Sequence, residues 1–600
     1  MFEGLGEMAE PADIDWSAPG APRSRIFDDI YFSTEGGLDE AQAVFLAGCG
    51  LPDAWRGRRR FVVGELGFGT GLNILALLEL WRRERPEGGR LEIFSVEAYP
   101  LSRTDARQAL GAWPELADLA EPLLRRWPTS EGFHRIDFPG LGASLDLAVM
   151  EAAEALGAWR GQADAWFLDG FAPSRNPAMW REEVLDLVAK RSSPGARAAT
   201  FTVAGAVRRG LAAAGFEAAR RPGFGRKAER LEAILPGGPH RDGAVPRVCI
   251  IGSGVAGAAL ARAFRAQGVT PLVLSDDTVA ASGNPAALVT PRFDAGGGAP
   301  AQLHAQAFTR AEAIYADEIP QAIISRGALQ LEAAERDGRR FDTVARSPLF
   351  EPGALERLDP GDAAARLGEP GGRGGLWIAD GLVVEPRLVL DAWLADCPRL
   401  EACVHAIRRG LDGWEILGDG GEVLAATELV CLAAGYGSRA LRPDLPLGPV
   451  RGQASFAAAA ERPQAAAWGG YVIPTRDGLL FGATHDRGRE DTEVDQADHR
   501  RNRQTLAQAR PALAAGLDET RLQGRAALRA STPDHGPIAG ELEPGLWVLA
   551  GLGGRGFTLA PVLAEHIAAT AVGAPSPLPG PLAVSVGPRV FAGRRAHTPD

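Results

Sequence analysis

RFVVGELGFGTGLNILALLELWRR, residues 60–83, is the stretch that decides the expected fold of the first half of this 600-residue chain. An apolar run of strand length (60–67) leads into a glycine-rich loop and then into an apolar-rich helical run (72–83). Glycine permits the positive φ angles of a sharp turn, so a strand–turn–helix unit is predicted. The apolar runs LEIFSVEA (91–98) and DAWFLDG (164–170) also alternate with helical stretches. This alternation predicts a parallel α/β sheet.

The chain is too long for one hydrophobic core. With 600 residues, 46% of them apolar, at least two domains are expected. LPGGPHRDGAVP (235–246) concentrates glycine, proline and polar residues and is predicted to be a linker. RVCIIGSG (247–254) then begins a second α/β unit, and short alternating runs within 375–456 and 468–485 predict an antiparallel substrate sheet.

Bulk properties limit the class of protein. The five cysteines contain no C-x-x-C pair, which argues against a disulfide framework and against a zinc cluster, so no metal is expected. The N-terminus resembles no export signal, and no uncharged apolar run reaches the roughly 18 residues that a membrane span requires. We therefore expect a soluble cytoplasmic protein. We also expect a monomer. The net charge of −12 is unusual for a protein that binds nucleic acid, because phosphate contacts need local positive charge.

The loop at 65–71 has the pattern E-x-G-x-G-x-G. Its glycines let backbone N–H groups approach a polar ligand at the start of a helix. The pattern resembles the first motif of Rossmann-like methyltransferases, which holds S-adenosylmethionine, and an acid at the end of the next strand would accept the ribose hydroxyls. A purely structural turn is the alternative. The residues predicted to bind this donor are Glu65, Gly67, Gly69, Gly71 and Glu97.

Asp169 leaves the third apolar run and enters GFAPSRNPAMW (170–180). Parallel α/β sheets bind ligands at the carboxyl ends of their strands, so Asp169 is predicted to meet the methyl donor and to act in catalysis. Phe171 and Trp180 are predicted to stack against a base. In the alternative interpretation Asp169 caps a helix and both rings belong to the core.

The second half opens with a dinucleotide fingerprint, GSGVAG (252–257), between a predicted strand and a predicted helix. ASGNPAA (281–287), TPDHGPIAG (532–540) and GLGGRG (551–556) resemble flavin-contacting elements of the glycine-oxidase and D-amino-acid-oxidase superfamily, so FAD is favoured over NAD. A fortuitous glycine-rich turn would explain each element alone but not all of them. The residues predicted to contact FAD are Gly252, Gly254, Gly257, Asp276, Ser282, Gly283, Asn284, Gly551, Gly553, Gly554, Arg555 and Gly556.

Two charged residues of this half have specific predicted roles. The ribose-binding acid of the fingerprint should follow PLVL (271–274) directly, but Ser275 is there and Asp276, which we select, comes next. Arg529, three residues before the TPDHGPIAG element, is predicted to hold a substrate carboxylate, because a guanidinium offers paired donors to a planar anion. A surface salt bridge is the alternative for Arg529.

Several signatures together resemble one family, the bifunctional 5-methylaminomethyl-2-thiouridine biosynthesis proteins of bacterial tRNA modification. They are WSAPGAPRSRIFDDIYFS (16–33), EGGLDEAQAVFLAG (35–48), ELGFGTGLN (65–73), DAWFLDGFAPSRNPAMW (164–180), ATFTVAGAVRRGLAAAGF (199–216) and GFGRKAERL (223–231). The resemblance implies that the first half methylates the amine of 5-aminomethyl-uridine and that Glu151 holds the adenine of the donor, although the family pattern suggests aspartate there. It implies that the second half oxidises 5-carboxymethylaminomethyl-uridine, so that glyoxylate leaves and a primary amine remains.

The resemblance implies a tRNA partner, contacted at its wobble uridine. Basic residues within 181–241 supply candidate phosphate contacts, of which we select Arg208, Arg209, Arg226 and Lys227, although scattered solvated side chains are an alternative. The expected fold class is α/β, a Rossmann-like methyltransferase domain (1–235) and a linker (236–246) before an FAD-binding Rossmann-type domain (247–600). In the second domain, the nucleotide-binding parts are expected at about 247–300 and 525–572, with an antiparallel β-rich substrate subdomain between them. The rival functions are a fused oxidase and methyltransferase of small free amines and a tRNA-binding scaffold without activity.

Overall fold

The computed structural model describes residues 12–17, 22–33, 36–225, 227–238, 243–276, 281–369, 372–459 and 462–588. The chain divides into two compact units. Unit 1 comprises 1–244 together with 574–580, and unit 2 comprises 245–573 together with 581–600. The short segment 574–580, which the sequence assigned to the second domain, thus belongs to unit 1, where Ser576 forms an isolated antiparallel bridge with Arg160.

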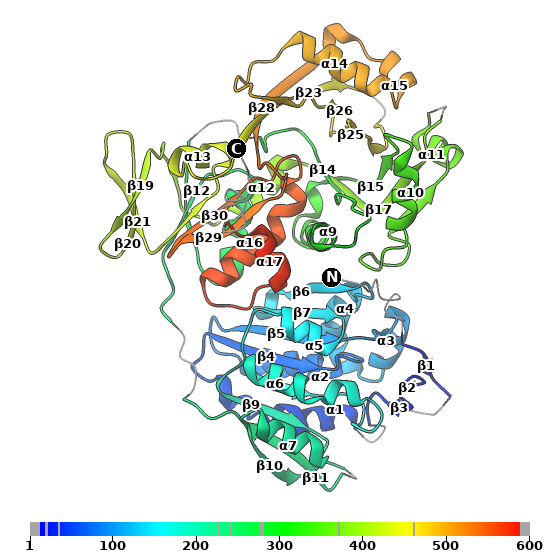
Figure 1. The fold of residues 1–600 in the computed structure, drawn as a ribbon, viewed down its shortest axis with the longest axis vertical. Coiled ribbons are helices and arrows are strands. Elements are labelled where there is room, and N and C mark those ends of the chain that lie inside the picture. The colour runs from blue at the N-terminus through cyan, green and yellow to red at the C-terminus, as the bar shows by residue number, and fades with distance from the viewer. Residues whose placement is uncertain are drawn as a thin grey trace, which may run out of the picture. The chain divides into compact units, whose positions relative to one another are not determined.

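Unit 1 is built on an eight-stranded sheet (Figure 1). Its central strands β9, β8, β4, β5 and β7 run parallel, and antiparallel strands extend both edges. β4 lies between β5 and β8, so the chain leaves β4 on one side and later returns on the other. Ligands of such sheets bind at this reversal of strand order. In spatial order the strands are β10 (Glu217–Pro222), β11 (Glu229–Ile234), β9 (Ser192–Thr200), β8 (Ala163–Leu168), β4 (Arg60–Leu66), β5 (Arg90–Glu97), β7 (Ala143–Val149) and β6 (Gly132–Phe138).

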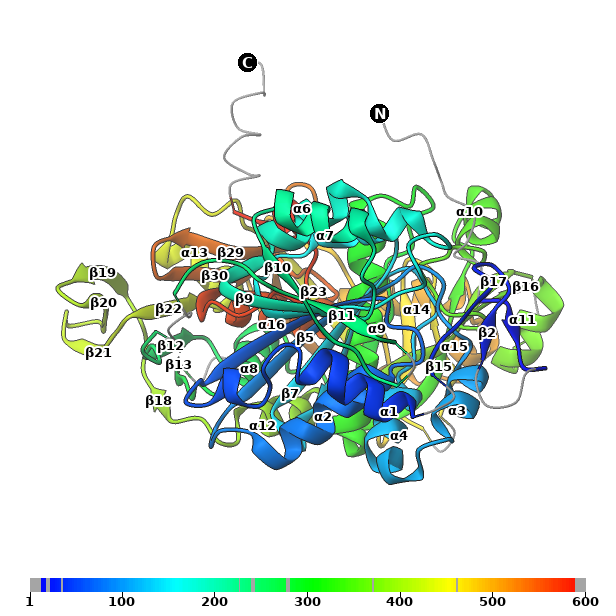
Figure 2. The same ribbon diagram turned by 90° about the horizontal axis from the view of Figure 1, so that it is seen from below.

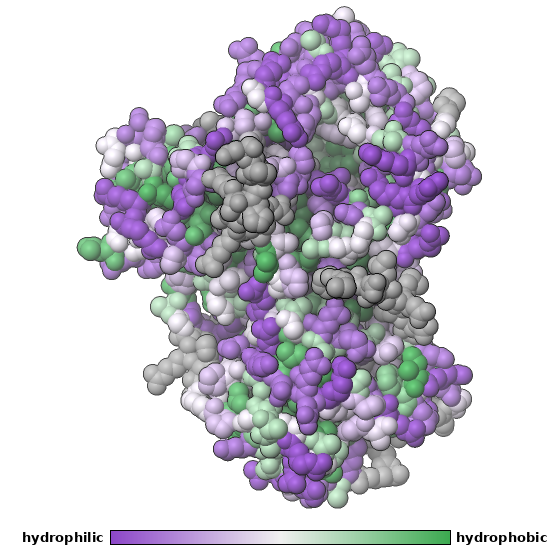
Figure 3. Space-filling view, viewed as in Figure 1, coloured by the Kyte–Doolittle hydropathy of each residue, from purple (hydrophilic) through white to green (hydrophobic). Residues whose placement is uncertain are grey.

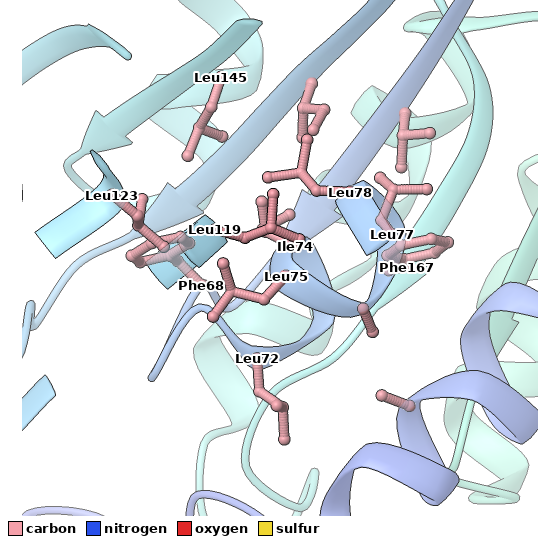
Figure 4. Packing of buried hydrophobic residues seen from close by; sticks show 14 of the residues in the cluster. Phe68, Leu72, Ile74, Leu75, Leu77, Leu78, Leu119, Leu123, Leu145 and Phe167 are labelled. Carbon is pink, nitrogen blue, oxygen red and sulfur yellow. The ribbon is translucent and has the colours of Figure 1, made fainter. Parts of the chain in front are cut away.

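Helices cover both faces of this sheet and form two cores. Figure 4 shows part of the first, in which side chains of α2 lie beside Phe68, residues of α4 and residues of the sheet. The labelled residues are Leu72, Ile74, Leu75, Leu77 and Leu78 of α2, Leu119 and Leu123 of α4, and Leu145 and Phe167 of the sheet. The second core buries side chains of α5, α6 and α7 on the other face. Gly37 packs against Leu72, which brings α1 beside α2 (Figure 2). The helices are α1 (Gly37–Glu40), the π-helix η1 (Ala41–Leu46), α2 (Leu72–Glu84), α3 (Arg103–Leu110), α4 (Ala117–Arg125), α5 (Ala152–Ala158), α6 (Glu182–Lys190) and α7 (Gly205–Ala213), and a small sheet contains β1 (Ile14–Asp15), β2 (Arg23–Ser24) and β3 (Asp29–Ile30).

Unit 2 contains two main sheets. The smaller is mostly parallel and includes the strand before the glycine fingerprint, and the larger is mostly antiparallel. The first has six strands, in the order β18 (Arg399–Glu401), β13 (Leu272–Ser275), β12 (Val248–Ile251), β22 (Leu429–Leu432), β30 (Leu546–Ala550) and β29 (Ile538–Glu543). All its pairs are parallel except β29 with β30. β12 precedes the glycine fingerprint and lies between β13 and β22, so it has the same position in this sheet as β4 has in unit 1.

The larger sheet has ten strands, and its pairs are antiparallel except β15 with β24. The strands are β14 (Ala287–Val289), β17 (Gly375–Val384), β15 (Ile323–Leu331), β24 (Ala465–Ala467), β25 (Tyr471–Pro474), β26 (Gly478–Gly482), β23 (Gly448–Ala458) and β27 (Asp486–Arg487), with β16 (Leu355–Leu358) beside β17 and β28 (Gln523–Ser531) beside β23. Helix α14 (Gln496–Ala507) covers one face of β23 (Figure 1). On that face Arg451 donates a 2.6 Å hydrogen bond to Asp498 of α14. The opposite face of β23 carries Val450, Gly452 and Ala454, and Ala454 packs into a small core with Ala286 and Ala328.

Buried charges tie the helices of the nucleotide-binding part together. Glu565 on α16 accepts hydrogen bonds from Arg262 on α8 at 2.7 Å and from Arg310 on α9 at 2.8 Å. The remaining elements are α8 (Val255–Ala266), α9 (Ala299–Glu318), α10 (Arg336–Val344), α11 (Pro360–Leu367), α12 (Pro386–Leu394), α13 (Ser438–Leu441), α15 (Pro511–Ala515), α16 (Gly556–Ala571), α17 (Gly580–Val586) and a three-stranded sheet of β19 (Ala406–Gly410), β20 (Gly413–Leu417) and β21 (Val423–Thr427).

The structure confirms the predicted α/β class and the predominantly antiparallel sheet of the second half. The face drawn in Figure 3 is largely hydrophilic, with hydrophobic residues in small scattered areas. Within the described ranges, no helix combines the length and the apolar character that crossing a membrane requires.

Candidate functional site

The glycine loop of unit 1 has the backbone that its sequence predicts. Gly67, Gly69 and Gly71 have φ angles of 84°, 53° and 76°, which residues other than glycine rarely adopt. A Cβ atom on Gly67 would lie 2.3 Å from the carbonyl oxygen of Asp169. Glycine therefore lets the loop after β4 pack directly against the loop after β8.

Acidic groups surround this loop in different ways. The Glu97 carboxylate accepts hydrogen bonds of 2.9 Å from the N–H groups of Gly69 and Tyr99, and burial raises its pKa. Glu97 ends β5 opposite Val149 of the parallel strand β7, and the exposed Glu151 follows β7, so both acids lie at the carboxyl edge of the sheet. The negative charge of Glu151 also raises the pKa of Glu97. Glu65 is completely buried and accepts a 2.5 Å hydrogen bond from Ser95, so its predicted contact with the donor is better explained as support of the loop.

Asp169 directly follows β8, and its carboxylate is held from two sides. Asn73 on α2 donates to one oxygen at 2.8 Å, and the N–H of Gly170 donates to the other at 2.9 Å. Burial raises the pKa of Asp169 from 3.8 to about 6, against the opposing effects of Asn73 and of Lys227. A carboxylate of this kind is ionised at neutral pH and is a better proton acceptor than a solvated one.

Aromatic residues of the N-terminal segment gather at the loop after β8. Phe171 stacks on Phe27 with a centroid separation of 4.8 Å and meets Tyr31 edge to face at 5.1 Å. Tyr99 also meets Phe27, at 5.4 Å. Phe27 and Tyr31 belong to one of the family signatures, but sequence reasoning gave them no role. The aromatic pattern of that signature is the signal that could have found them.

Trp180 differs from its predicted role. Its side chain lies in the second core, is only 8% exposed, and donates a 3.0 Å hydrogen bond to the carbonyl oxygen of Phe171. A ring with so little free surface has no face for a base. We therefore reassign Trp180 from base stacking to holding the loop in place.

The predicted basic residues fall into separate groups. Arg208 and Arg209 are exposed on α7 and form no ion pair within the described part of the chain. Lys227 forms a 2.7 Å ion pair with Glu40 and lies 4.0 Å from the ring centroid of Phe201. Arg226 lies outside the described residues.

The predicted flavin elements come together in unit 2. The Ser282 hydroxyl accepts a 3.0 Å hydrogen bond from the N–H of Val255, the first residue of α8. A Cβ atom on Gly556 would lie 2.8 Å from Cγ1 of the same valine, so the 551–556 loop also reaches the fingerprint. Gly252 has a φ of 107°, and a Cβ on Gly257 would lie 1.8 Å from the Gly252 carbonyl oxygen.

The other predicted flavin residues have distinct surroundings. Asn284 accepts a 3.0 Å hydrogen bond from Arg525, and Arg555 donates to the Thr290 carbonyl oxygen at 2.8 Å. Burial lowers the pKa of Arg555 to about 10. The glycines Gly551 and Gly553 have φ angles of 72° and 55°. Gly254 is the N-cap of α8, and Gly554 has open space where a Cβ would lie. Gly283 is exposed, and so is Asp276, which directly follows β13.

Arg529 lies on β28 opposite Val450, and its side chain reaches over Gly452 on the face of β23 that is turned away from α14. A Cβ atom on Gly452 would lie 2.6 Å from the Arg529 guanidinium, so this glycine makes room for it. Burial lowers the pKa of His485, and the positive charge of Arg529 lowers it further. Burial raises the pKa of Tyr471, and the charge of Arg529 opposes that rise. Arg529 forms no ion pair in the described ranges, which argues against the salt-bridge alternative.

The residues present fit both cofactors. In unit 1, the turn at 67–71 leaves no room for larger side chains and brings an N–H group to the Glu97 carboxylate, which suits the polar ends of S-adenosylmethionine. In unit 2, Gly553 and Gly554 come just before α16 and have open space where a Cβ atom would lie, and the fingerprint starts α8, which suits the phosphates and ring of FAD. Sequence reasoning missed Asn73, Gly452 and Tyr471, because only the fold brings them to these sites.

Family models match both halves of the chain. The model described as an S-adenosyl-L-methionine-dependent methyltransferase matches residues 114–236, and the one described as an FAD dependent oxidoreductase matches 247–570. The chain is 55% identical over 604 residues to the tRNA 5-methylaminomethyl-2-thiouridine biosynthesis bifunctional protein MnmC of Caulobacter sp. (strain K31), covering 98% of this chain and 99% of that one. It is 42% identical to the protein of the same name from Maricaulis maris, covering 99% and 98%.

A solved structure shows the same fold as the second half. The iminodiacetate oxidase of Chelativorans sp. BNC1 matches with a TM-score of 0.50 and 21% identity, covering 57% of this chain and 100% of that one. At this identity the likeness concerns the fold alone.

Proposed function

The chain belongs to the family of bifunctional tRNA 5-methylaminomethyl-2-thiouridine biosynthesis proteins, and from this premise we propose that it carries out two successive reactions on a tRNA wobble uridine. Unit 2 removes the carboxymethyl group from 5-carboxymethylaminomethyl-(2-thio)uridine, and unit 1 methylates the amine that remains. The product of the first reaction is the nucleophile of the second, which explains why one chain contains both activities. FAD and S-adenosylmethionine are the cofactors.

In the oxidative step, the methylene carbon next to the carboxylate gives up a hydride and the attached nitrogen gives up a proton to solvent, so their C–N bond becomes an imine. Water then hydrolyses the imine to glyoxylate and a primary amine. When bound, FAD would supply the acceptor for the hydride. The task of Arg529 is to hold the substrate carboxylate by paired hydrogen bonds, since its guanidinium is not engaged by a protein carboxylate in the described part of the chain. Gly452 lets the guanidinium lie across β23. The half-buried Tyr471 helps exclude water from this face.

In the methylation step, the incoming ammonium must lose a proton before its nitrogen can attack the methyl group. S-adenosylmethionine supplies that methyl group. Asp169 orients the amine and takes up its proton, and Asn73 holds the carboxylate that does so. The positive charge of Lys227 lowers the pKa of Asp169, and the carboxylate of Glu40, which pairs with Lys227, opposes this effect.

The observation that carries the methylation proposal is the position of Asp169 against the glycine loop. Its backbone touches Gly67, and its carboxylate is bonded to the first turn of α2. Glu151 and Glu97 lie at the same edge and are proposed to hold the adenosine. Phe171 is proposed to contact the base, and Arg208, Arg209, Arg226 and Lys227 the tRNA. We also propose a cytoplasmic monomer, with a methyltransferase domain at 1–235, a linker at 236–246 and an oxidoreductase domain at 247–600.

Nucleoside mass analysis of tRNA tests this function. Cells without the protein should accumulate 5-carboxymethylaminomethyl-(2-thio)uridine, and cells with only the oxidase active should accumulate the 5-aminomethyl form. The alternative, an enzyme of small free amines, requires that the tRNA nucleosides be the same with and without the protein.

A further inference from the structure

Three neighbouring strands of the ten-stranded sheet place two arginines in one row. Val450 on β23 pairs with Arg487 on β27 and with Arg529 on β28. Residues that are directly opposite one another in a sheet share a face, so both arginines stand on the side of Val450. With strands about 4.8 Å apart, their Cα atoms are separated by about 10 Å. The charges of both arginines lower the pKa of His485, which places the two groups near the same histidine.

The two guanidinium groups point in different directions along the strands. Arg529 lies over Gly452, on the side of Ala527. Arg487 donates a 3.3 Å hydrogen bond to Nε2 of His535, which lies beyond the other end of β28. The second ring nitrogen of His535 then carries the proton and donates to the Ser531 hydroxyl at 3.3 Å. The row therefore offers two separate anion positions rather than one shared position.

In the part of the chain that the structure describes, no carboxylate neutralises either position. Within the described ranges, Arg487 and Arg529 form no ion pair with a carboxylate, whereas the nearby Arg489 pairs with Asp491 at 2.8 Å. Asp486, the residue before Arg487, is engaged by Arg501 at 2.8 Å. The carboxylate of Asp534 accepts hydrogen bonds from Thr532 and Gly536 at 3.0 and 3.1 Å.

We propose that Arg487, oriented by His535, binds the phosphate on the 5′ side of the uridine whose carboxymethyl group is held by Arg529. The inference rests on the proposed function, because it takes a nucleotide within RNA as the substrate. A pyrimidine in the usual anti conformation carries its C5 substituent on the same side as its 5′-phosphate. The substrate thus presents a carboxylate and a phosphate to one face, as the two guanidinium groups require. Arginine suits both anions, since its planar fork binds carboxylate and phosphate oxygens in pairs.

This second position gives the oxidase a means to prefer RNA over free amino acids. A free glycine derivative has the carboxylate but no phosphate, so it forgoes the contact with Arg487. Arg487 therefore determines specificity, and His535 is a positioning residue.

The test uses the flavin-loaded full chain and a synthetic anticodon stem-loop that contains 5-carboxymethylaminomethyl-uridine. One version has only phosphodiesters, and the others carry a neutral methylphosphonate on the 5′ or the 3′ side of that uridine. For the wild type, the 5′ methylphosphonate should raise KM for flavin reduction, and Kd by fluorescence anisotropy, about ten-fold, the loss expected for one hydrogen-bonded charge. The 3′ methylphosphonate should change neither.

In Arg487→Gln the all-phosphodiester stem-loop should bind about ten-fold more weakly, and the 5′ methylphosphonate should cause no further loss. His535→Ala should weaken binding less than Arg487→Gln and add nothing to it in the double variant. Arg489→Gln removes a nearby, partly exposed charge that is paired with Asp491, so it should behave as the wild type. Full flavin absorbance of each variant shows that it folds.

The inference is overturned if Arg487→Gln keeps the 5′ methylphosphonate penalty, or if the 3′ methylphosphonate is the one that weakens binding. If the wild type oxidises none of the stem-loops, the proposed function itself fails. That result differs from the first two, in which the all-phosphodiester stem-loop is still oxidised.

Discussion

The side-chain amide of Asn73 donates a 2.8 Å hydrogen bond to the carboxylate of Asp169, although the two residues are 96 positions apart in the chain. Asn73 belongs to the first turn of α2, directly after the glycine loop, and Asp169 directly follows β8. The bond favours the ionised carboxylate, while burial favours the neutral one and raises its pKa to about 6. The proposed proton acceptor is thus both charged at neutral pH and held in a fixed direction.

Asp169→Asn should lower the methylation rate about 10²- to 10⁴-fold, the usual contribution of a general base, because the amide keeps the shape but cannot accept the proton. S-adenosylmethionine affinity, measured by calorimetry, and the oxidase activity should stay close to those of the wild type. A variant that methylates at the wild-type rate from pH 6 to pH 9 would show that the proton leaves through water.

The same substitution should alter stability in a pH-dependent manner. The pKa of Asp169 is raised from 3.8 to about 6 in the folded protein, so the folded state binds more protons than the unfolded state between these values. Its contribution to stability therefore falls as pH rises from about 4 to about 6. The measurement is the Tm of the unfolding transition that S-adenosylmethionine shifts. We expect the Tm difference between Asp169→Asn and the wild type to change in favour of the variant as pH rises from about 4 to about 6, and to stay constant at higher pH. A Tm difference between the variant and the wild type that does not change with pH would contradict the raised pKa.

Gly257→Val should abolish flavin binding, because even a Cβ atom there would lie 1.8 Å from the Gly252 carbonyl oxygen. A bulky residue at Gly254 should act in the same direction, since that position starts α8. The purified variants should lack the visible flavin absorbance. Gly516→Ala is the matched control, because its Cβ would have only ordinary contacts of 3.5 Å or more. Full flavin content in Gly257→Val would refute the placement of the pyrophosphate.

Arg529→Lys should reduce the oxidase kcat/KM about ten-fold or more, since lysine keeps the charge but cannot form the paired hydrogen bonds to a carboxylate. Methylation of preformed 5-aminomethyl-uridine in tRNA should be unchanged. Gly452→Ala should reproduce the oxidase defect, because its Cβ would lie 2.6 Å from the Arg529 guanidinium. An equal loss in both assays would exclude a role for Arg529 specific to the carboxylate.

Charge reversal at Arg208 and Arg209 should weaken tRNA binding and flatten its salt dependence, by about one unit of log–log slope for each phosphate that the protein no longer neutralises. The matched control reverses Arg220 and Arg221, which are on the neighbouring β10 and already pair with Glu229 and Glu232. Filter binding over a range of salt concentrations measures both. If the two double variants have the same slope as the wild type, the α7 arginines are ordinary solvated side chains.

The sequence alone determined those features that depend on a few consecutive residues. The positive φ angles at Gly67 and Gly252 were predictable because a strand that turns sharply into a helix requires glycine at such positions. The carboxyl-edge location of Asp169 followed from the strand before it. The alternation of apolar runs indicated the parallel sheet of unit 1, and the resemblance of whole motifs indicated the family.

Only the tertiary structure decided which distant side chains meet. The bond from Asn73 to Asp169 depends on β4 and β8 being neighbours, and the row of Arg487, Val450 and Arg529 depends on the register of three strands. The burial of Trp180 depends on how its loop folds back onto the second core, so its aromatic character alone suggested the wrong surface. A local pattern specifies backbone angles within a turn or two, whereas strand order and register result from the packing of the whole sheet.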